Sequence, residues 1–495
     1  MKNKLIALLG GASMLALTGC GEEFLEVEPS QFLTQEQVQE AAENNPDVVA
    51  GSMSGIYTLM FQTGTGGDGG HDDFGQKGYD IFSDFLTSDL ALSISTYGWY
   101  RTVTEYQATT DFTFGENYMV WRYYYRIVRS ANLVIDALGG NDAVPELDEN
   151  LHIMGQAKAM RAYAYFYLTQ FMQRDYNPSE EILPIYIVPD SPNVGKSTAQ
   201  EVFDLIVSDL TDAIDHLETF QRGAKNEVNQ NVAKALLAYT YAAMGDYAQT
   251  KTLTAEIINS GEFTLVNKTE ATGGFNDVAT PGWMWGADLT NDIGLNLVSW
   301  WGQMDAYTYS YQWAGDRKVM DQSLFDLIPA NDVRKGQFLD NSASAYHLAP
   351  INKFYDPNRV IGGQRYITTD YVYMRVAEMY LLHAEASAAT GDDASARQSL
   401  KALLVERLEN PGDENYVDAL SGQALMDEIY LQTRIELWGE GKTYLALKRT
   451  DNTTFRGDNH LSSVGETLES DDPKLTFMIP QSEIQNNPFI DSQNN

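Results

Sequence analysis

Cysteine and positive charge are both scarce in this sequence. Cysteine occurs once, at position 20, so no disulfide can form within the chain. Lys and Arg number 33 against 69 Asp and Glu, which gives a formal net charge of −36. Because nucleic-acid phosphates require a basic surface, this balance excludes nucleic acid as a partner. It also argues against electrostatic adhesion to anionic lipid head groups.

Long apolar runs and common catalytic motifs are missing as well. After Cys20 no segment approaches the ~20 consecutive apolar residues of a transmembrane helix. Neither H-E-x-x-H nor G-x-S-x-G occurs. The run His71-Asp72-Asp73 has no second histidine cluster or spaced carboxylates beside it, so a solvated loop is expected there. We therefore expect no metal and no cofactor.

The N-terminus has the pattern of a secretory signal. Lys2 and Lys4 precede an apolar run over 5–17, which is too short to span a bilayer as a helix. The run ends in Leu17-Thr18-Gly19-Cys20, which resembles the lipobox of bacterial lipoproteins. In that class of protein the cysteine is acylated and becomes the first residue of the mature chain. Cys20 is thus the expected lipidation site, and it predicts a membrane anchor outside the cytoplasm.

The residues after Cys20 refine this location. Gly21-Glu22-Glu23 resembles the acidic signal that sends lipoproteins to the outer surface in Bacteroidetes-type bacteria. Several acyl chains together give stable anchoring, where one chain is marginal. The stretch 26–30, which contains Pro29, is interpreted as part of a short tether.

Helical periodicity dominates the strong signals in the rest of the chain. Thr198, or Ser197 before it, followed by Glu201 is a capping-box pattern that marks a helix start. The predicted helices are 154–174, 198–217, 232–244, 247–260, 372–390 and 394–408.

Two helix pairs, 232–260 and 372–408, are built alike. Each has small alanines along its first helix and then a Gly-Asp hinge, at Gly245-Asp246 and Gly391-Asp392. They resemble the tetratricopeptide unit, in which alanine permits close helix approach and glycine allows the turn. The region 262–371 between them is rich in Gly, Asn and aromatic residues. A long irregular insertion in a helical scaffold is where function is expected.

The order of several segments resembles that of a known family. These segments are 121–132 (WRYYYRIVRSAN), 155–158 with 161–163, 201–210, 233–247 (AKALLAYTYAAMGDY), 257–261, 375–386 (RVAEMYLLHAEA), 434–441 (RIELWGEG) and 479–488. Together with the lipobox, they make the mature chain similar to the SusD/RagB family of outer-membrane nutrient-uptake lipoproteins.

The resemblance implies a non-enzymatic binding protein that is dominated by α-helices, with minor β-structure in its loops. Family members form a lid on a TonB-dependent (SusC-like) outer-membrane transporter and capture oligosaccharides or, in some cases, peptides. Four tetratricopeptide-like helix pairs form the scaffold, and irregular loops carry the ligand. The expected divisions are a signal peptide (1–19), a lipidated tether (20–35), a helical region (36–261), a ligand-binding insertion (262–371) and a C-terminal helical region (372–495).

Clustered aromatic residues indicate where a sugar would bind, because the C–H face of a pyranose packs on flat rings. Five of the eight tryptophans fall between 283 and 313. Gly282, Gly286 and Gly302 flank four of them and favour exposure in loops. Alternation from Tyr307 to Trp313 would place four rings on one face of a strand, either outward or packed inward. The candidate ligand-binding residues are Trp99, Trp283, Trp285, Trp300, Trp301, Tyr307, Tyr309 and Trp313.

Other functions stay open at this stage. The same fold could bind a peptide or another nutrient. A surface-anchored glycoside hydrolase and a purely structural helical scaffold are further alternatives. Because 69 acidic residues place some carboxylates close together by chance, a carboxylate pair alone would prove little. Structural ion pairs are expected for the glutamates in the C-terminal helices, which are Glu378, Glu385, Glu436 and Glu440.

Overall fold

A computed structural model describes residues 45–494 of the chain. The predicted signal, Cys20, the acidic residues 21–23 and the tether lie outside the described residues. Within 45–494, no helix is both long and apolar enough to cross a membrane. The fold is helix-rich with a few short strands, as the sequence predicts.

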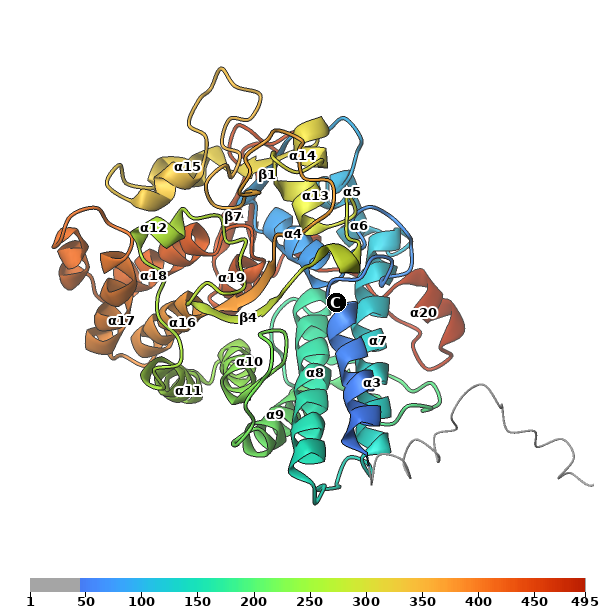
Figure 1. Cartoon of the computed structure of the whole chain (residues 1–495). Helices are drawn as coiled ribbons and strands as arrows, with labels where there is room; N and C mark the ends of the chain where they lie inside the picture. Colours follow the sequence, from blue (N-terminus) through green and yellow to red (C-terminus); the bar gives the residue numbers. More distant parts are fainter. Residues whose placement is uncertain (1–44, 495) are drawn as a thin grey trace, which may run out of the picture.

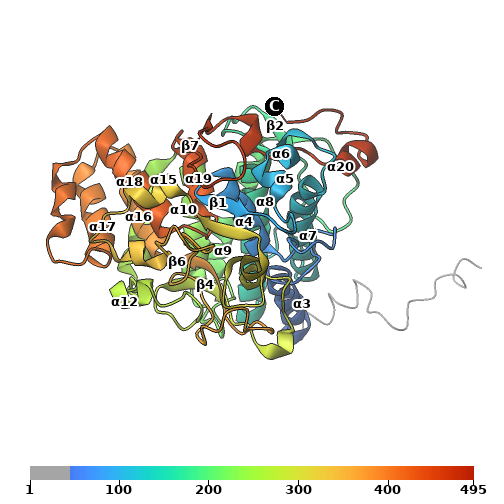
Figure 2. The same ribbon diagram turned by 90° about the horizontal axis from the view of Figure 1, so that it is seen from above.

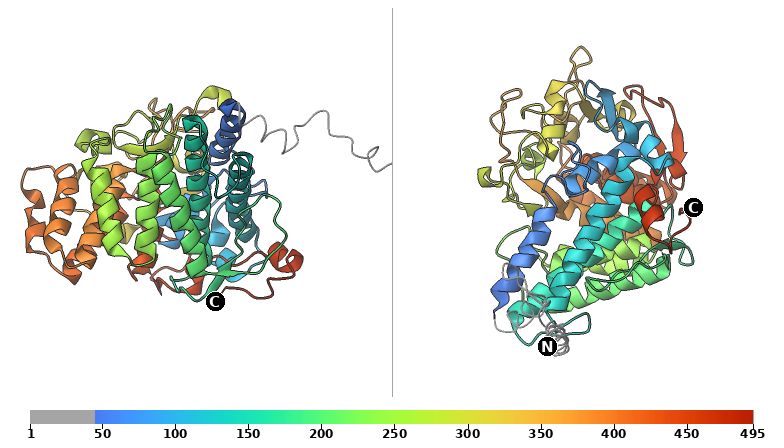
Figure 3. Two further views of the ribbon diagram at one scale, coloured as in Figure 1. Left: turned by 90° about the horizontal axis from the view of Figure 1, so that it is seen from below. Right: turned by 90° about the vertical axis from the view of Figure 1, so that its right-hand side faces the viewer.

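The long helices pack side by side as one layer, which is seen most clearly from below (Figure 3, left). They are α3 (Pro46–Leu59), α7 (Gly115–Ala137), α8 (Asp148–Met172), α9 (Ala199–His216), α10 (Gln230–Ala243), α11 (Tyr247–Asn259), α16 (Val376–Ala389), α17 (Asp393–Val405) and α18 (Gln423–Glu436). From α7 to α17, each helix of this layer contacts the next one along the chain.

Local capping explains where several of these helices begin. Thr198 and Glu201 form the predicted capping box at the start of α9. Gly245 and Gly391 have φ values of +78° and +79°, which glycine adopts without steric cost. The aspartate after each glycine caps the next helix, α11 or α17. Both predicted hinges are therefore confirmed.

Helix α8 contacts α3, α7 and α9 and is buried on all sides along most of its length. Its polar residues accordingly have close partners. Arg161 forms two hydrogen bonds to the Asp209 carboxylate, at 2.8 and 2.7 Å, and so ties α8 to α9. Burying both charges is tolerable because they are paired.

Most of the shorter elements form a second layer over one end of the helices, in the upper part of Figure 1 and facing the viewer in Figure 2. The helical ones are α4 (Gln76–Leu86), α5 (Arg101–Thr104), α6 (Gln107–Thr110), α12 (Lys268–Ala271), η2 (Asn291–Ile293), α13 (Trp300–Met304), α14 (Tyr311–Ala314), α15 (Gln322–Leu327), η3 (Val333–Gln337), α19 (Lys442–Arg449) and η5 (Pro473–Leu475). Two short helical elements lie elsewhere: η4 (Asp413–Ala419) packs on α17, and α20 (Gln481–Asn486) lies beside α7.

The strands of residues 45–494 form four two-stranded antiparallel sheets. These are β1 (Leu90–Ile94) with β5 (Arg317–Met320), β2 (Glu181–Leu183) with β3 (Ser197–Thr198), β4 (Trp283–Ala287) with β6 (Tyr371–Arg375), and β7 (Thr453–Phe455) with β8 (Thr467–Glu469). The helix predicted at 372–390 therefore begins later than expected. Residues 371–375 are extended because they pair with β4, and α16 starts at Val376.

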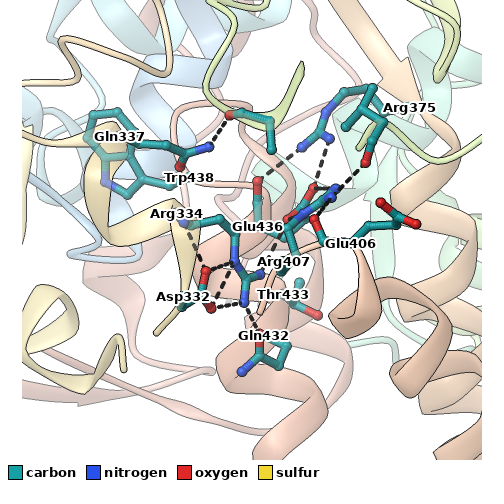
Figure 4. A network of polar contacts seen from close by, with 12 residues as sticks. Asp332, Arg334, Gln337, Arg375, Glu406, Arg407, Gln432, Thr433, Glu436 and Trp438 are labelled. Atoms are coloured by element: carbon teal, nitrogen blue, oxygen red, sulfur yellow. Dashed lines mark hydrogen bonds and ion pairs between the residues drawn. The ribbon is translucent and has the colours of Figure 1, made fainter. Parts of the chain in front are cut away.

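A buried ionic network joins this second layer to the C-terminal helices (Figure 4). The Glu436 carboxylate on α18 accepts hydrogen bonds from Arg375 at 2.9 Å, from Arg407 at 2.8 Å and from Arg334 at 3.3 Å. Glu440 forms ion pairs with Arg375 at 2.8 Å and with Lys353 at 3.0 Å. Glu436 and Glu440 thus form the structural ion pairs that the sequence predicts.

Candidate functional site

Aromatic side chains from segments far apart in the sequence gather in the loop layer. We call this group the aromatic face, and it consists of His71, Tyr97, Trp99, Tyr307, Tyr309, Tyr311 and Trp313. It combines the loop before α4, the loop before α5 and the segment around α14. In Figure 1, α5 and α14 lie near the top, at the opposite end of the molecule from the lower ends of α3 and α8.

Trp99 is at the centre of one half of the aromatic face. The His71 ring stacks on it in parallel with 5.1 Å between ring centroids. Tyr311 meets both rings edge-on, at 5.7 Å from His71 and 5.8 Å from Trp99. The His71 Nδ1 and the Tyr311 hydroxyl are 2.5 Å apart. Tyr97 packs edge-on against Tyr311 and is 59% exposed, so it extends this half toward solvent.

The loop that carries Trp99 is held by one buried carboxylate. Asp316, just before β5, accepts backbone N–H bonds from Thr96 at 2.6 Å, Tyr97 at 2.8 Å and Trp99 at 3.3 Å. Strand β5 pairs with β1, which leads into the same loop. The position of Trp99 is therefore fixed by a carboxylate next to a paired strand, and little ordering is left for a ligand to induce.

The other half of the aromatic face combines rings with arginines. Tyr309 and the half-buried Trp313 lie 5.4 Å apart. The Arg365 guanidinium stands 3.9 Å from the centre of the Tyr309 ring. Arg359 lies 5.6 Å from the centre of the Tyr307 ring, and both arginines are exposed. Both contacts are cation–π pairs. The guanidinium N–H groups of the two arginines can still reach solvent or a ligand.

Asp305 and Gly362 shape this second half. The Asp305 carboxylate accepts hydrogen bonds from the Tyr307 N–H at 2.9 Å and the Asp356 N–H at 2.9 Å, and so joins two loops. Gly362 has a φ of +63°, and a Cβ at this position would lie 2.9 Å from the Trp313 ring. Only glycine fits here, because the backbone lies flat against the indole.

A buried polar layer adjoins the aromatic face. The Lys318 ammonium donates to the Gln303 side chain at 2.9 Å, and Gln303 donates to the His71 carbonyl at 2.7 Å. Burial lowers the pKa of Lys318 to about 7, although Asp316 opposes the shift. Burial, helped by Asp68, raises the pKa of Asp72 to about 7. This layer supports the rings and does not reach a ligand.

The aromatic face has the chemistry of a carbohydrate-binding surface. Half-exposed rings suit the C–H faces of pyranoses, and the guanidinium groups can donate to sugar hydroxyls or to an acidic sugar. Among residues 45–494, no group of three His, Cys, Asp or Glu side chains is placed to hold a metal ion.

Trp283 and Trp285 do not belong to this surface, contrary to our expectation of exposed loops. They lie in β4 and are 0% and 1% exposed. The Trp285 indole donates to the Asn226 carbonyl at 2.7 Å. Gly286 beside them serves close packing, because a Cβ there would lie 2.7 Å from the Tyr371 carbonyl of the paired strand.

Trp300 and Trp301 are also buried, and the prediction that they are exposed is wrong as well. They form the first turn of α13 and are each 1% exposed. The Trp301 indole donates to the Asp370 carbonyl at 3.2 Å, while Trp300 meets Phe354 edge-on at 4.6 Å. Gly302 allows the turn to pack tightly on residue 297, so it too indicates close approach.

The predicted strand over 307–313 is replaced by a loop and a short helix. Thr308 forms one isolated bridge with Gln364, and Ser310 then caps α14 by accepting the Trp313 N–H at 3.0 Å. Tyr307, Tyr309 and Trp313 are nevertheless half-buried at the surface. The three rings therefore belong to the aromatic face, although the strand-like alternation that predicted a common face does not form.

Several residues of the surface were not anticipated. Residues 71–73 are not a solvated loop, because His71 stacks on Trp99 and Asp73 accepts the Gly66 and Gly67 N–H groups at 2.7 and 2.8 Å. Arg359 and Arg365 belong to a loop whose sequence gives no sign of its contacts. Only the neighbouring aromatic residues at 97–100 indicated the first half of the aromatic face.

The amino-acid sequence of the chain is similar to two family models and to two curated proteins. A family model described as "SusD family" matches residues 307–495, and one described as "Starch-binding associating with outer membrane" matches residues 77–242. A "SusD-like protein P25" of Formosa agariphila is 22% identical over 200 residues, 40% of this chain and 35% of the relative. A "SusD-like protein" of Bacteroides ovatus is 32% identical over 125 residues, 25% of this chain. The matches span about a third or less of those two relatives.

Solved structures share the fold over nearly the whole chain. A SusD superfamily protein of Bacteroides thetaiotaomicron superposes with a TM-score of 0.75 at 23% identity, covering 91% of this chain and 99% of that one. A SusD-like carbohydrate binding protein of Bacteroides vulgatus gives 0.73 at 23% identity, with 90% and 97% covered. Surface glycan-binding protein A of Bacteroides fluxus gives 0.68 at 16% identity, with 90% and 98% covered.

Proposed function

We propose that this chain is a SusD-family protein that binds oligosaccharides at the aromatic face, because models described as "SusD family" and "Starch-binding associating with outer membrane" match residues 307–495 and 77–242. We further propose that it is a lipoprotein anchored through Cys20 and facing the cell exterior. In this role it passes its ligand to a partner TonB-dependent transporter. We propose that it acts as a binding protein and not as an enzyme, because the aromatic face offers ring surfaces and hydrogen-bond donors that suit binding.

The observation that supports oligosaccharide binding best is the fixed placement of half-exposed rings. Trp99 and Trp313 come from segments more than two hundred residues apart, and buried carboxylates hold the loops beside them. Rings held in this way can stack on successive sugar units with little loss of conformational entropy. The ligand-binding region then consists of part of 262–371 together with His71 and residues 97–99.

Calorimetry with a panel of neutral and acidic oligosaccharides tests this proposal. The protein is the chain without residues 1–20, and the variants are Trp99→Ala and Trp313→Ala. We expect at least one oligosaccharide to bind, and each variant to weaken it by roughly tenfold or more. Phe455→Ala is the matched control, because Phe455 is 44% exposed on β7, outside the aromatic face.

The same samples test the alternatives. Binding of peptides but of no saccharide would assign the aromatic face to a peptide-capturing member of the fold. Release of shorter sugars from a purified sample would contradict a binding-only role. Unchanged affinity in both tryptophan variants would show that the ligand binds elsewhere.

A further inference from the structure

A cavity lies away from the aromatic face, between α7, the connection 184–193 and α20. Its volume is about 320 Å³. Helix α20 lies beside α7 in both Figure 1 and Figure 2, away from α14. The lining residues that matter most are Trp121, Tyr125, Arg129, Tyr186, Asn193 and Glu483. None of them belongs to the aromatic face.

Three aromatic rings form one wall of this cavity. Trp121 and Tyr125 are four residues apart and therefore lie on the same side of α7. Their ring centroids are 4.8 Å apart and the rings are tilted by 46°. Tyr186 meets Tyr125 edge-on at 5.8 Å. The Tyr125 hydroxyl donates to the Pro184 carbonyl at 2.8 Å, which fixes this ring against the connection.

The backbone around Tyr186 is held by side chains of the helix layer. The Asn132 amide donates to the Tyr186 carbonyl at 2.9 Å, and Arg161 donates to the Asn132 oxygen at 2.9 Å. The Tyr186 N–H donates to the Tyr165 hydroxyl at 2.7 Å. The ring wall is therefore as fixed as the helices beneath it.

The opposite wall comes from the C-terminal segment. The Asn487 amide donates to the Val194 carbonyl at 2.9 Å, and the Asn193 amide donates to the Asn486 carbonyl at 3.2 Å. These bonds hold the segment that contributes Glu483 to the cavity lining, and the Glu483 carboxylate also accepts from the Asn487 amide at 2.9 Å. The cavity is thus assembled from segments almost three hundred residues apart.

Polar groups of both signs stand at the mouth. Arg129 pairs with Asp190 at 3.3 Å, but both side chains are more than half exposed. Such a pair contributes little and can open for a ligand. Arg129 can then donate to hydroxyls, while Glu483 can accept from them. A pyranose packs its C–H face on flat rings and needs hydrogen-bonding groups at its hydroxyl edge. This cavity offers both.

We propose that this cavity is a second carbohydrate site, which takes a single sugar ring or the end of an oligosaccharide. Its volume is near the lower limit of ~300 Å³ for small-molecule pockets, so it suits a short ligand. The inference rests on the proposed function for the class of ligand but uses none of the same residues. Two sites on one chain raise the local concentration of a long glycan, so one end stays bound while the other exchanges.

Fluorine NMR tests both sites separately in one sample. The full chain with Cys20→Ala is labelled with fluorotryptophan, and its eight tryptophans give separate reporters. Trp121 reports on the cavity, and Trp99 and Trp313 report on the aromatic face. The buried Trp283, Trp285, Trp300, Trp301 and Trp438 serve as internal controls. Trp121→Phe assigns the cavity signal.

The probes are maltoheptaose, cellohexaose, xylohexaose, mannohexaose and an oligogalacturonate at millimolar concentration. We expect at least one to shift the Trp121 signal saturably, and to do so also in the Trp99→Ala, Trp313→Ala double variant. Tyr186→Ala should weaken this response by roughly tenfold, whereas the ring-retaining Tyr186→Phe should stay within about threefold.

The remaining outcomes separate this inference from the proposed function. Shifts of Trp99 or Trp313 without Trp121 would overturn the cavity proposal and leave the aromatic face intact. A shift of Trp121 alone would support the cavity and count against the aromatic face. No shift with any probe would overturn both. A Trp121 response to prolyl or aromatic peptides and to no saccharide would assign the cavity to a protein partner.

Discussion

At the scale of single residues, Trp301 and Trp313 differ in what their rings contact. Trp301 is 1% exposed and its indole N–H is bonded to a backbone carbonyl, so it belongs to the core. Trp313 is half-buried and rests on Gly362, with part of its ring free. The same chemical group therefore contributes to the core in one position, and in the other it is free for the recognition proposed above.

We predict that Trp301→Ala lowers the free energy of unfolding by about 3–5 kcal/mol, because it leaves a large cavity in the core. Trp313→Ala should change it by roughly 1 kcal/mol or less while weakening oligosaccharide binding. Urea unfolding followed by circular dichroism measures the first quantity. Equal stability losses in the two variants would contradict this division.

Gly362 provides a second prediction at this scale. Gly362→Ala should displace Trp313, because the new Cβ would lie 2.9 Å from its ring, and should weaken oligosaccharide binding. Gly64→Ala is the matched control, since Gly64 has a similar φ of +71° but open space around it. Both variants should lose about 1 kcal/mol of stability through backbone strain. Equal ligand affinity in the two variants would show that Trp313 is not part of the site.

Residue types alone predicted the membership of the aromatic face, the candidate site, only in part. Trp99, Tyr307, Tyr309 and Trp313 could be chosen because rings near irregular, polar sequence suit a sugar. The four buried tryptophans were misassigned because flanking glycines indicate either exposure or close approach, and sequence does not separate the two. Gly286 and Gly302 both mark close approach.

At the scale of elements, the buried ionic network fixes how β6 meets the C-terminal helices. Burial alone would raise the pKa of Glu440, but Arg375 and Lys353 outweigh it and lower the pKa to about 2. Because the ordinary pKa of a glutamate is 4.5, the ionised form of Glu440 is more stable in the folded state than in the unfolded state. This contribution is complete above pH 4.5 and is lost as the pH falls toward 2.

We therefore predict an acid-induced loss of stability between pH 4.5 and 2, of which Glu440 contributes roughly 3 kcal/mol. Urea unfolding across this range measures it. Glu440→Gln should be less stable at neutral pH, because Arg375 and Lys353 lose a partner, and should show a shallower pH dependence. A variant with the same slope as the parent chain would place the titration elsewhere.

Helix pairs were the most predictable elements, because their periodicity, alanines and Gly-Asp hinges all act locally. The start of α16 was placed too early because the strand β6 exists only through its pairing with β4, almost ninety residues away. The approach of residues 97–99 to α14 is likewise set by one carboxylate, Asp316. Tertiary contacts of this kind leave no periodic signal in the sequence.

At the scale of the whole molecule, the fold separates a layer of long helices from a layer of loops and short elements. Figure 1 shows the long helices on one side and the loops around α5 and α14, which carry the aromatic face, on the other. Helix α3 begins at the lower, helical side, so the described chain starts away from the aromatic face. An anchor attached ahead of α3 would leave the proposed ligand surface free.

This arrangement predicts separable roles for anchor and body. Cys20→Ala should leave oligosaccharide affinity of the purified protein unchanged, because the rings proposed to bind the oligosaccharide belong to residues 71–313. Uptake of the same oligosaccharide by cells should fall, since the lid would no longer be held beside its transporter. Normal uptake by this mutant would mean that the transporter contact alone retains the protein.

The most direct test of oligosaccharide capture at the aromatic face is a crystal structure with a bound glycan from the panel. The account predicts a pyranose whose C–H face lies about 4 Å from the ring of Trp99 or Trp313, with hydroxyls toward Arg359 or Arg365. A glycan bound only at other residues, with these four side chains still facing solvent, would contradict it.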